Sequence, residues 1–474
     1  MVNAIKKVKL FFCNFLWIVS YIPCSICFFC KARDIQKVQN RKLLNIIRKN
    51  QTSLFGKKFA FKSIYSYDDY KKNVPIQEYE DLSPYIEKIA RGEDNILTTE
   101  KVIILEPTSG SSGKKKYIPY TKSLKKEFQK AIAPWLSDVY FHYPRLLCGQ
   151  SYWSISPQTQ KNRKNIGFKD DSEYLSGLSK WFMKQIMAVP TSFEKTKEMF
   201  EENKHIRLIS IWSPTFLDSI FDKDFRFTRS LENIKFVSAW GDASSSHFLS
   251  LIKTYFPQAI FQPKGLLSTE CFASFPLCNS DDKAVLAYQS HFFEFLDADG
   301  HVFLAHQLKC EKKYTLIVTT SGGLYRYNTH DVVRVKGFYK KVPLIQFCGR
   351  DNQTSDFFGE KLNELFVQSA CANVFKKLKI TPSFFVLTFC QNHYRLFIEG
   401  RKLPLEKISI FLEKELEENF HYKYCISLKQ LHSVDCKCIR NGMKKYIDFY
   451  RKKGVKLGDI KVKILDVAFG WEDK

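Results

Sequence analysis

The chain has 474 residues, which is too long for one ordinary domain and suits two or three. Hydrophobic residues make up 45% and charged residues 26%, so large globular cores are expected. The formal net charge of +25 attracts polyanions, but the basic residues form short runs without any homeodomain, zinc-finger or ribonucleoprotein signature, which argues against nucleic acid as a partner.

The first predicted element is an uncharged 21-residue stretch from Leu10 to Cys30 with basic residues on both sides. As a helix it would extend about 31 Å at 1.5 Å per residue, close to the hydrocarbon thickness of a bilayer. No small-residue cleavage site follows, which argues against a removed signal peptide. Asn14 and Pro23 weaken a spanning helix, and the basic flanks give no clear orientation. Two interpretations stay open: membrane association through residues 10–30, or a helix buried against the main domain.

From about residue 36 the pattern becomes that of a soluble α/β protein. Residues 37–50 repeat apolar side chains at helical spacing, and residues 50–56 form a turn-rich break. Val102–Leu105 is a short apolar run with β-branched residues, typical of a buried strand. This alternation of short apolar runs and helical stretches predicts the α/β class.

Directly after this predicted strand comes Thr108-Ser-Gly-Ser-Ser-Gly-Lys-Lys-Lys116. Glycines and small residues let backbone N–H groups approach a phosphate closely, hydroxyls add donors, and lysines neutralise charge. The segment is not a Walker A loop, because Lys115 stands where that motif needs glycine after Gly110. The residues alone leave two interpretations, a phosphate-binding loop or a flexible polar turn.

Three motifs in order give the chain a family resemblance. The loop resembles the phosphate-binding loop of adenylate-forming enzymes, Ser/Thr-Ser-Gly-Thr/Ser-Thr-Gly-x-x-Lys. It is followed by Lys-Gly-Leu-Leu-Ser-Thr-Glu at 264–270 and Tyr-Arg-Tyr-Asn-Thr-His-Asp at 325–331. Over residues 36–470 the chain resembles the auxin-responsive acyl acid–amido synthetases of plants (the Gretchen Hagen family) and their bacterial relatives. Three flanking segments agree, at residues 73–81, 92–97 and 356–362.

The resemblance implies an architecture. A large α/β domain of the adenylate-forming kind, with mixed sheets and helices, is expected over residues 35–350. A small, mobile α+β domain is expected over residues 351–474, and the hydrophobic segment 1–34 precedes both. Gly349-Arg-Asp351 resembles the hinge between the two domains, and Arg350 would contact the ribose or a phosphate.

The resemblance also implies ATP and Mg²⁺ at the first two motifs. The residues expected to hold the β- and γ-phosphates are Ser109, Gly110, Ser111, Ser112, Gly113 and Lys116. Glu270, after the nucleotide-binding residues Ser268 and Thr269, would help to hold Mg²⁺. Without the family, an isolated Ser-Thr-Glu is most often a helix cap.

The third motif would bind the ribose. Asp331 matches the family's aspartate that accepts hydrogen bonds from the ribose hydroxyls, a task that suits a carboxylate because it offers several acceptors. His330 stands where glycine is usual, and Asn328 stands where arginine is common. Alone, His330 is more typical of a structural histidine than of a catalytic base.

Two further sites follow from the resemblance. Gly241 and Ala243 lie where relatives carry a strand-end loop near the adenine and acyl pocket, although residues 244–246 would equally cap a helix. Lys461 matches the adenylation lysine, a mobile point charge that can reach the α-phosphate; Lys456 and Lys463 leave its register open.

The predicted function is ATP-dependent adenylation of a carboxylic acid, followed by acyl transfer to an amine such as an amino acid. The alternatives are transfer to a thiol such as coenzyme A, or a catalytically silent, membrane-associated relative. The fourteen cysteines are scattered as in a reducing compartment and show no usual zinc spacing, so we expect a cytoplasmic protein, with the N-terminal segment as its route to a membrane. The acid, the acceptor and the oligomeric state are not readable.

Overall fold

The computed structural model describes residues 2–108, 116–153, 177–188, 193–211, 231–240, 255–280 and 283–453, and near the C-terminus residues 455, 460 and 462–467. These residues fall into two compact units. Unit 1 comprises the described residues within Met1–Gly241, Leu251–Thr329 and Val333–Phe347, and unit 2 comprises those within His330–Val332 and Cys348–Lys474.

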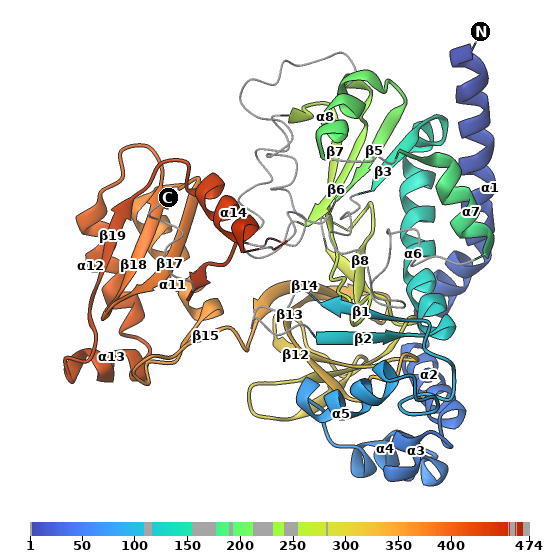
Figure 1. Cartoon of the computed structure of the whole chain (residues 1–474), viewed down its shortest axis with the longest axis horizontal. Coiled ribbons are helices and arrows are strands. Elements are labelled where there is room, and N and C mark those ends of the chain that lie inside the picture. The colour runs from blue at the N-terminus through green and yellow to red at the C-terminus, as the bar shows by residue number, and fades with distance from the viewer. Residues whose placement is uncertain are drawn as a thin grey trace. The chain divides into compact units, whose positions relative to one another are not determined.

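A parallel sheet forms one part of unit 1, in the strand order β4-β3-β5-β6-β7 (Figure 1). All its neighbouring strands run parallel. Every residue of β6 is buried, in keeping with its mostly apolar sequence Phe-Val-Ser-Ala-Trp. The strands are β3 (Gln150–Trp153), β4 (Met187–Ala188), β5 (Ile206–Ser210), β6 (Phe236–Trp240) and β7 (Ile260–Lys264).

A seven-stranded sheet has the order β11-β10-β12-β13-β14-β9-β8. Strand β10 is antiparallel to β11 and β12, and β9 is antiparallel to β8 and β14. Its strands are β8 (Ser274–Pro276), β9 (Ala284–Leu286), β10 (Phe292–Leu296), β11 (Val302–Leu304), β12 (Lys313–Thr319), β13 (Tyr327–Tyr339) and β14 (Val342–Arg350). A separate antiparallel pair joins β1 (Ile104–Thr108) to β2 (Lys116–Tyr120).

The helices of unit 1 surround these sheets. They are α1 (Val2–Lys31), α2 (Ile35–Lys49), α3 (Leu54–Lys58), α4 (Tyr67–Asn73), α5 (Tyr79–Ala90), α6 (Lys122–His142), α7 (Gly177–Ile186) and α8 (Phe193–Glu202), with 3₁₀ helices η1 (Phe61–Ser63), η2 (Pro144–Cys148) and η4 (Leu231–Asn233). Ser66 and Asp69 form a reciprocal capping box that starts α4.

Helix α1 contains the predicted apolar stretch and packs on α6, α7 and η2. By length and composition alone, Ile5–Lys31 is apolar enough to cross a membrane. One side of α1 nevertheless lies in the core of unit 1, and its buried residues recur at intervals of three or four: Leu10, Asn14, Trp17, Tyr21, Ser25 and Phe28. The Asn14 amide donates to the carbonyls of Leu147 and Gly149, each at 2.9 Å.

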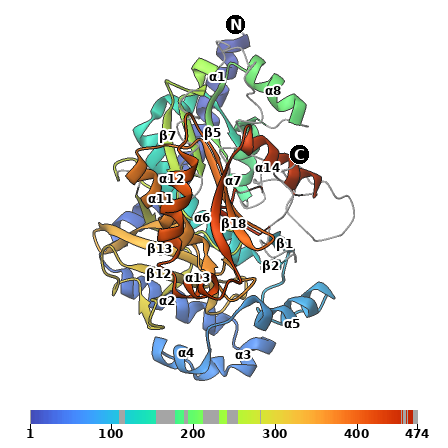
Figure 2. The same ribbon diagram turned by 90° about the vertical axis from the view of Figure 1, so that its left-hand side faces the viewer.

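Unit 2 is an α+β structure around the sheet β19-β18-β17-β20. Residues 385, 387 and 389 of β17 join the core with α11 and α12, whereas residues 384 and 386 join the core with α14 (Figure 2). This alternation is the two-residue period of a strand that is covered on both faces. The elements are β15 (Thr354–Ser355), β16 (Leu362–Asn363), α11 (Glu364–Leu378), β17 (Phe384–Cys390), β18 (His393–Glu399), α12 (Leu405–Leu416), α13 (Phe420–Ser427), β19 (His432–Cys438), α14 (Gly442–Lys452) and β20 (Leu465–Asp466).

The predicted fold class, α/β with a small α+β part, is confirmed. The predicted strand at Val102–Leu105 lies two residues too early, because the ladder to β2 begins at Ile104 and continues into the polar residues before the loop. The helix predicted over residues 37–50 is α2, and Asn50 is its C-cap.

Candidate active site

The predicted phosphate loop connects two paired strands. Thr108 at the end of β1 lies opposite Lys116 at the start of β2, so residues 109–115 close this hairpin. The loop residues Ser109, Gly110, Ser111, Ser112 and Gly113 lie outside the described residues. Lys116 is half-buried, and its Nζ lies 5.0 Å from the centroid of the Tyr79 ring. The Tyr79 hydroxyl accepts the Tyr117 N–H at 2.8 Å, which attaches the base of the hairpin to α5.

The second motif forms a tight turn after β7. Leu267 and Phe272 form a β-bridge, and the Ser268 N–H donates to the Cys271 carbonyl at 2.9 Å. The Tyr120 hydroxyl, at the end of β2, donates to the Thr269 carbonyl at 2.6 Å. The strand that carries Lys116 is therefore joined directly to the turn that carries Glu270.

A buried polar network supports this turn from within unit 1. The Phe272 N–H donates to Nε2 of His291 at 3.1 Å, and Nδ1 of His291 lies 3.0 Å from Glu127 Oε2. Because Nε2 accepts the hydrogen bond from Phe272, Nδ1 carries the imidazole hydrogen and donates a hydrogen bond to Glu127. Lys42 Nζ lies 2.7 Å from Glu127 Oε1, and the Ser321 hydroxyl donates to the same oxygen at 2.6 Å.

The charges of this network follow from burial and pairing. Burial raises the pKa of Glu127, but Lys42 and the hydrogen bond from His291 lower it further than burial raises it, to about 2. Burial lowers the pKa of His291, and the bond to Glu127 offsets this only in part. Burial also lowers the pKa of Lys42. The described arrangement is an anionic Glu127 between a lysine and a neutral histidine.

The carboxyl ends of the parallel strands bring together a lysine and two tryptophans. Lys264 Nζ, at the end of β7, lies 2.6 Å from Ser210 Oγ at the end of β5. It also lies 5.1 Å and 5.8 Å from the ring centroids of Trp135 and Trp153. Ligands of α/β folds commonly bind at this edge of a sheet, where a half-buried cation can attract an anion.

Gly265 is required beside this lysine. A Cβ at Gly265 would lie 2.2 Å from the backbone oxygen of Ser274, so no larger residue fits without moving the backbone. Strand β6 ends at Trp240, as the predicted strand-end loop requires. Gly241 and Ala243 lie outside the described residues, as does Lys461.

The end of the third motif, His330 and Asp331, lies in unit 2 with the predicted hinge, whereas residues 325–329 lie in unit 1. Arg350 Nε lies 3.3 Å from Asp331 Oδ1, and Asp331 is buried. His330 Nδ1 lies 2.7 Å from Asp351 Oδ1, and the Asp351 N–H donates to the His330 carbonyl at 3.0 Å. His330 has a φ of 62°, a left-handed conformation that favours glycine, the usual family residue here.

Glu270 fits the role of a magnesium ligand by its surroundings. The side chain is half-buried, and its carboxylate has no hydrogen bond or ion pair with any described residue. Mg²⁺ commonly takes one or two protein carboxylates and completes its shell with phosphate oxygens and water. The clusters Asp138–His142–Cys278 and Asp297–Asp299–His301 could hold a cation by spacing, but neither includes a motif residue.

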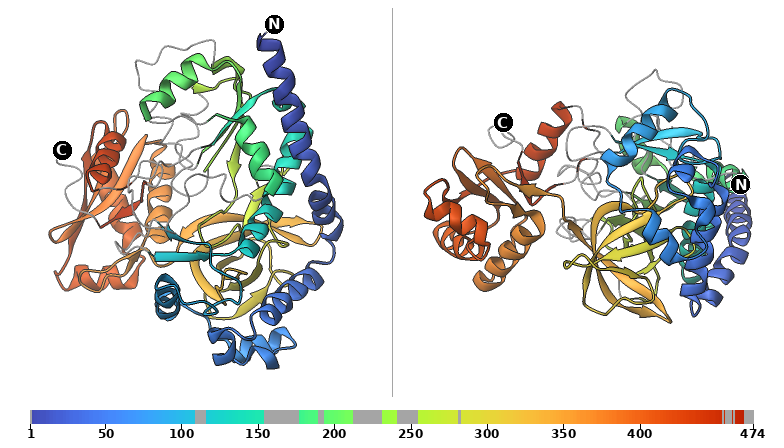
Figure 3. Two further views of the ribbon diagram at one scale, coloured as in Figure 1. Left: turned by 45° about the vertical axis from the view of Figure 1, so that its right-hand side comes forward. Right: turned by 90° about the horizontal axis from the view of Figure 1, so that it is seen from below.

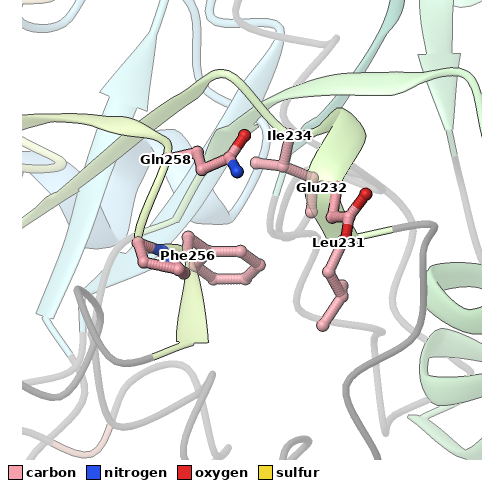
Figure 4. Close-up of a pocket in the computed structure, with 6 residues that line it drawn as sticks. Leu231, Glu232, Ile234, Phe256 and Gln258 are labelled. Atoms are coloured by element: carbon pink, nitrogen blue, oxygen red, sulfur yellow. The ribbon is translucent and has the colours of Figure 1, made fainter.

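One small cavity of about 70 Å³ lies at the opposite edge of the parallel sheet (Figure 4). Leu231, Glu232 and Ile234 precede β6, and Phe256 and Gln258 precede β7. The cavity therefore lies at the amino ends of two parallel strands, away from the edge that carries Lys264. We assign it no part in the site.

Family models match the chain in three consecutive parts. The GH3 family N-terminal domain matches residues 28–220, the central domain residues 284–350, and the C-terminal domain residues 364–466. Together these matches cover well over half of the chain. The chain belongs to the GH3 family. The family resemblance of the three motifs is thereby confirmed.

Sequence relatives within the GH3 family are amido synthetases. Indole-3-acetic acid-amido synthetase GH3.15 of Arabidopsis thaliana is 24% identical over 441 residues, covering 74% of this chain and 73% of the relative. Indole-3-acetic acid-amido synthetase GH3.3 of the same plant is 19% identical over 537 residues, covering 91% and 89%.

Solved structures show the fold that this GH3 protein shares. AtGH3.15 acyl acid amido synthetase in complex with 2,4-DB has a TM-score of 0.80 at 18% identity, over 95% of both chains. 2-Hydroxyisobutyryl-CoA ligase in the postadenylation state has a TM-score of 0.59 at 10% identity, over 92% of this chain and 89% of the ligase. The fold is that of adenylate-forming ligases.

The sequence indicated no role for Lys264, Tyr120 or the Glu127–His291 pair. Lys264 left a signal, since it is the first residue of the second motif. The other residues left none, because Glu127 and His291 are 164 residues apart and Tyr120 meets Thr269 across 149 residues.

Proposed function

We propose that this GH3 protein adenylates a carboxylic acid with ATP and then transfers the acyl group to the amine of an amino acid. The observation that carries the proposal is the direct link between the Lys116 strand and the Glu270 turn, through Tyr120 and Thr269 at 2.6 Å. Two motifs assigned to phosphate and metal binding are thus held together in a chain of a family whose named members are amido synthetases.

In the first step, a carboxylate oxygen of the acid attacks the α-phosphorus of ATP, and the bond to the pyrophosphate oxygen breaks. Negative charge is spread over the phosphate oxygens in the transition state, so positioning and cationic stabilisation supply most of the catalysis. Lys116 and the loop of Ser109, Gly110, Ser111, Ser112 and Gly113 hold the β- and γ-phosphates. Lys461 neutralises charge at the α-phosphate.

Glu270, with Ser268 and Thr269, forms the part of the site that binds the metal ion. When bound there, Mg²⁺ neutralises charge on the phosphate oxygens. Asp331 accepts hydrogen bonds from the ribose, and Arg350 orients that carboxylate from 3.3 Å. Gly241 and Ala243 border the adenine and acyl pocket.

In the second step, the neutral amine attacks the acyl carbon of the adenylate. The bond from that carbon to the AMP oxygen breaks, the amide forms, and the amine loses a proton. We place the hinge between these steps at residues 350 and 351, with residues 351–474 as the mobile domain. The segment 1–34 lies before the catalytic domain at 35–350.

The acceptor decides between two classes of ligase. The test supplies the full-length protein with ATP, Mg²⁺, pooled carboxylic acids and either pooled amino acids or coenzyme A, and detects products by mass spectrometry. We expect amides and not thioesters. Thioester products would identify the protein as a coenzyme A ligase. An adenylate that hydroxylamine traps, with neither amides nor thioesters formed, would exclude both acceptors tested. The full chain is required because α1 is packed into unit 1.

A further inference from the structure

The outward side of α1 is apolar along almost its whole length. Helix α1 lies beside α6 and α7, along the outside of unit 1 (Figures 1 and 3). Its exposed large apolar side chains recur at helical spacing and so share one face: Ile5, Val8, Phe12, Phe15, Leu16, Val19, Ile22 and Ile26. We call these eight residues the outer face of α1.

The next helix shows what an ordinary solvent-facing side looks like. The exposed residues of α2 are all polar or charged: Gln36, Lys37, Arg41, Asn45, Arg48 and Lys49. Between Leu10 and Cys30, by contrast, α1 exposes no charged side chain. The hydroxyl of exposed Ser20 is bonded to the Trp17 carbonyl at 2.5 Å. A contiguous apolar face of this kind marks an interaction surface.

The exposed charges of the chain up to Arg33 are all positive. Lys6, Lys7 and Lys9 are exposed among the first residues of the outer face, and Lys31 and Arg33 are exposed after it. The sequence has no aspartate or glutamate before Asp34. A second copy of the chain would bring two such basic ends against each other, whereas an anionic lipid surface complements both ends at once.

The inner side of α1 excludes a helix that crosses the bilayer in this folded state. The Tyr288 hydroxyl donates to the Phe28 carbonyl at 2.5 Å, Ser25 Oγ lies 2.8 Å from Ser137 Oγ, and Asn14 is bonded to η2 and Gly149. Crossing would break these bonds and uncover the core face of α6. An amphipathic helix can instead lie in the plane of the interface.

We propose that α1, while docked on unit 1, lies on an anionic membrane surface with its outer face among the lipid headgroups and upper acyl chains. The neighbouring helix α7 adds an exposed Trp181 and an exposed Lys184, residue types that favour the interface. This surface is separate from the nucleotide motifs, so the proposal is independent of the proposed ligase activity.

The test is flotation of the full-length protein with vesicles of phosphatidylcholine alone or with 30% phosphatidylserine. The variant Phe15→Gln, Ile22→Gln, Ile26→Gln removes apolar area from the outer face without touching the core. The matched control is Ile410→Gln, Phe420→Gln, which removes exposed apolar side chains from unit 2. Circular dichroism melting checks that both remain folded.

We expect wild type and control to bind the anionic vesicles and to be released by 0.5 M NaCl. The outer-face variant should bind at least about tenfold more weakly. No binding by the wild type, or equal binding by the outer-face variant, would overturn the proposal. So would protein that resists extraction by alkaline carbonate, which indicates a spanning helix. A wild-type dimer that the variant dissociates, without vesicle binding, would assign the outer face to a second copy.

Discussion

Two histidine–carboxylate pairs, one in each unit, have almost the same geometry and very different surroundings. In unit 1, His291 and Glu127 meet at 3.0 Å with side chains 0% and 3% exposed. In unit 2, His330 and Asp351 meet at 2.7 Å with side chains 19% and 38% exposed. The first pair is fixed within a network that also contains Lys42, whereas the second lies at the predicted hinge, where water screens it.

Burial therefore decides how much each pair can contribute to the free energy of unfolding. His291 is neutral, so the ion pair of the buried network is that of Glu127 with Lys42; such a pair contributes little when whole, but removing one partner leaves an uncompensated charge at high cost. A partly exposed pair contributes little either way and is free to rearrange. The buried pair supports the Ser268–Glu270 turn through the hydrogen bond from the Phe272 N–H, and the partly exposed pair suits the proposed hinge.

The largest effect is expected for Glu127→Gln. Lys42, whose side chain is only 14% exposed, would be left without its carboxylate, so the free energy of unfolding should fall by about 3–5 kcal/mol, measured by urea denaturation at pH 7. The double variant Lys42→Met, Glu127→Gln removes the unpaired charge and should recover part of that loss. A loss below about 1 kcal/mol in the single variant would show that the buried network is not stabilising.

Substitution of the ribose-binding aspartate should lower the affinity for ATP and leave the free energy of unfolding unchanged. Asp331→Asn weakens acceptance of the ribose hydroxyls, and ATP should bind about ten- to a hundredfold more weakly by calorimetry, as expected for hydrogen bonds to a charged group. Asp435→Asn is the matched control, because Asp435 also pairs with an arginine of unit 2, Arg395 at 2.6 Å. Equal loss in both variants would contradict a specific role for Asp331.

The pH dependence should come mainly from the buried pair. The unfolded His291 takes up a proton near pH 6.5, but the lowered pKa keeps the folded imidazole neutral, so stability falls as the pH drops below about 6.5. Glu127 adds a second loss as the pH falls from about 4.3 towards 2.

The measurement is urea unfolding at pH 7.0 and pH 5.0 in wild type and His291→Gln. The decrease between the two pH values should be smaller in the variant, because glutamine does not titrate. An unchanged decrease would assign the acid sensitivity to other groups.

The smallest effect is expected for His330→Gly. The substitution removes an exposed pair but relieves a φ of 62°, so stability should change by no more than about 1 kcal/mol. His330→Ala removes the same pair without relieving the backbone and should be the less stable of the two. If a folded His330→Gly protein loses ATP–pyrophosphate exchange, the result would contradict a purely structural role for His330.

The sequence predicted what depends on local pattern. The strand before the Thr108–Lys116 segment and the helix over residues 37–50 are local features, and the order of the motifs identified the family. Asn14 shows what a local sequence pattern cannot predict. In the sequence it weakens a spanning helix, but its bonds to Leu147 and Gly149 cross more than 130 residues, and only the fold brings them together.

The same limit applies to the candidate site. Glu270 was predicted from its motif, whereas Glu127, His291 and Tyr120, which hold its turn, lie in separate segments with no motif of their own. The outer face of α1 could be seen as an apolar run. Which side of that run is buried depends on the position of α6, and this position is not encoded in the run itself.

The most direct test of the central claim is acid-dependent ATP–pyrophosphate exchange in the full-length protein with Mg²⁺ and pooled carboxylic acids. Exchange should occur in wild type and in Glu311→Gln, which changes an exposed glutamate paired with Lys336, and it should be lost in a folded Glu270→Gln. Wild-type protein that binds ATP but exchanges with no acid pool, or Glu270→Gln that exchanges like wild type, would contradict adenylation at this site.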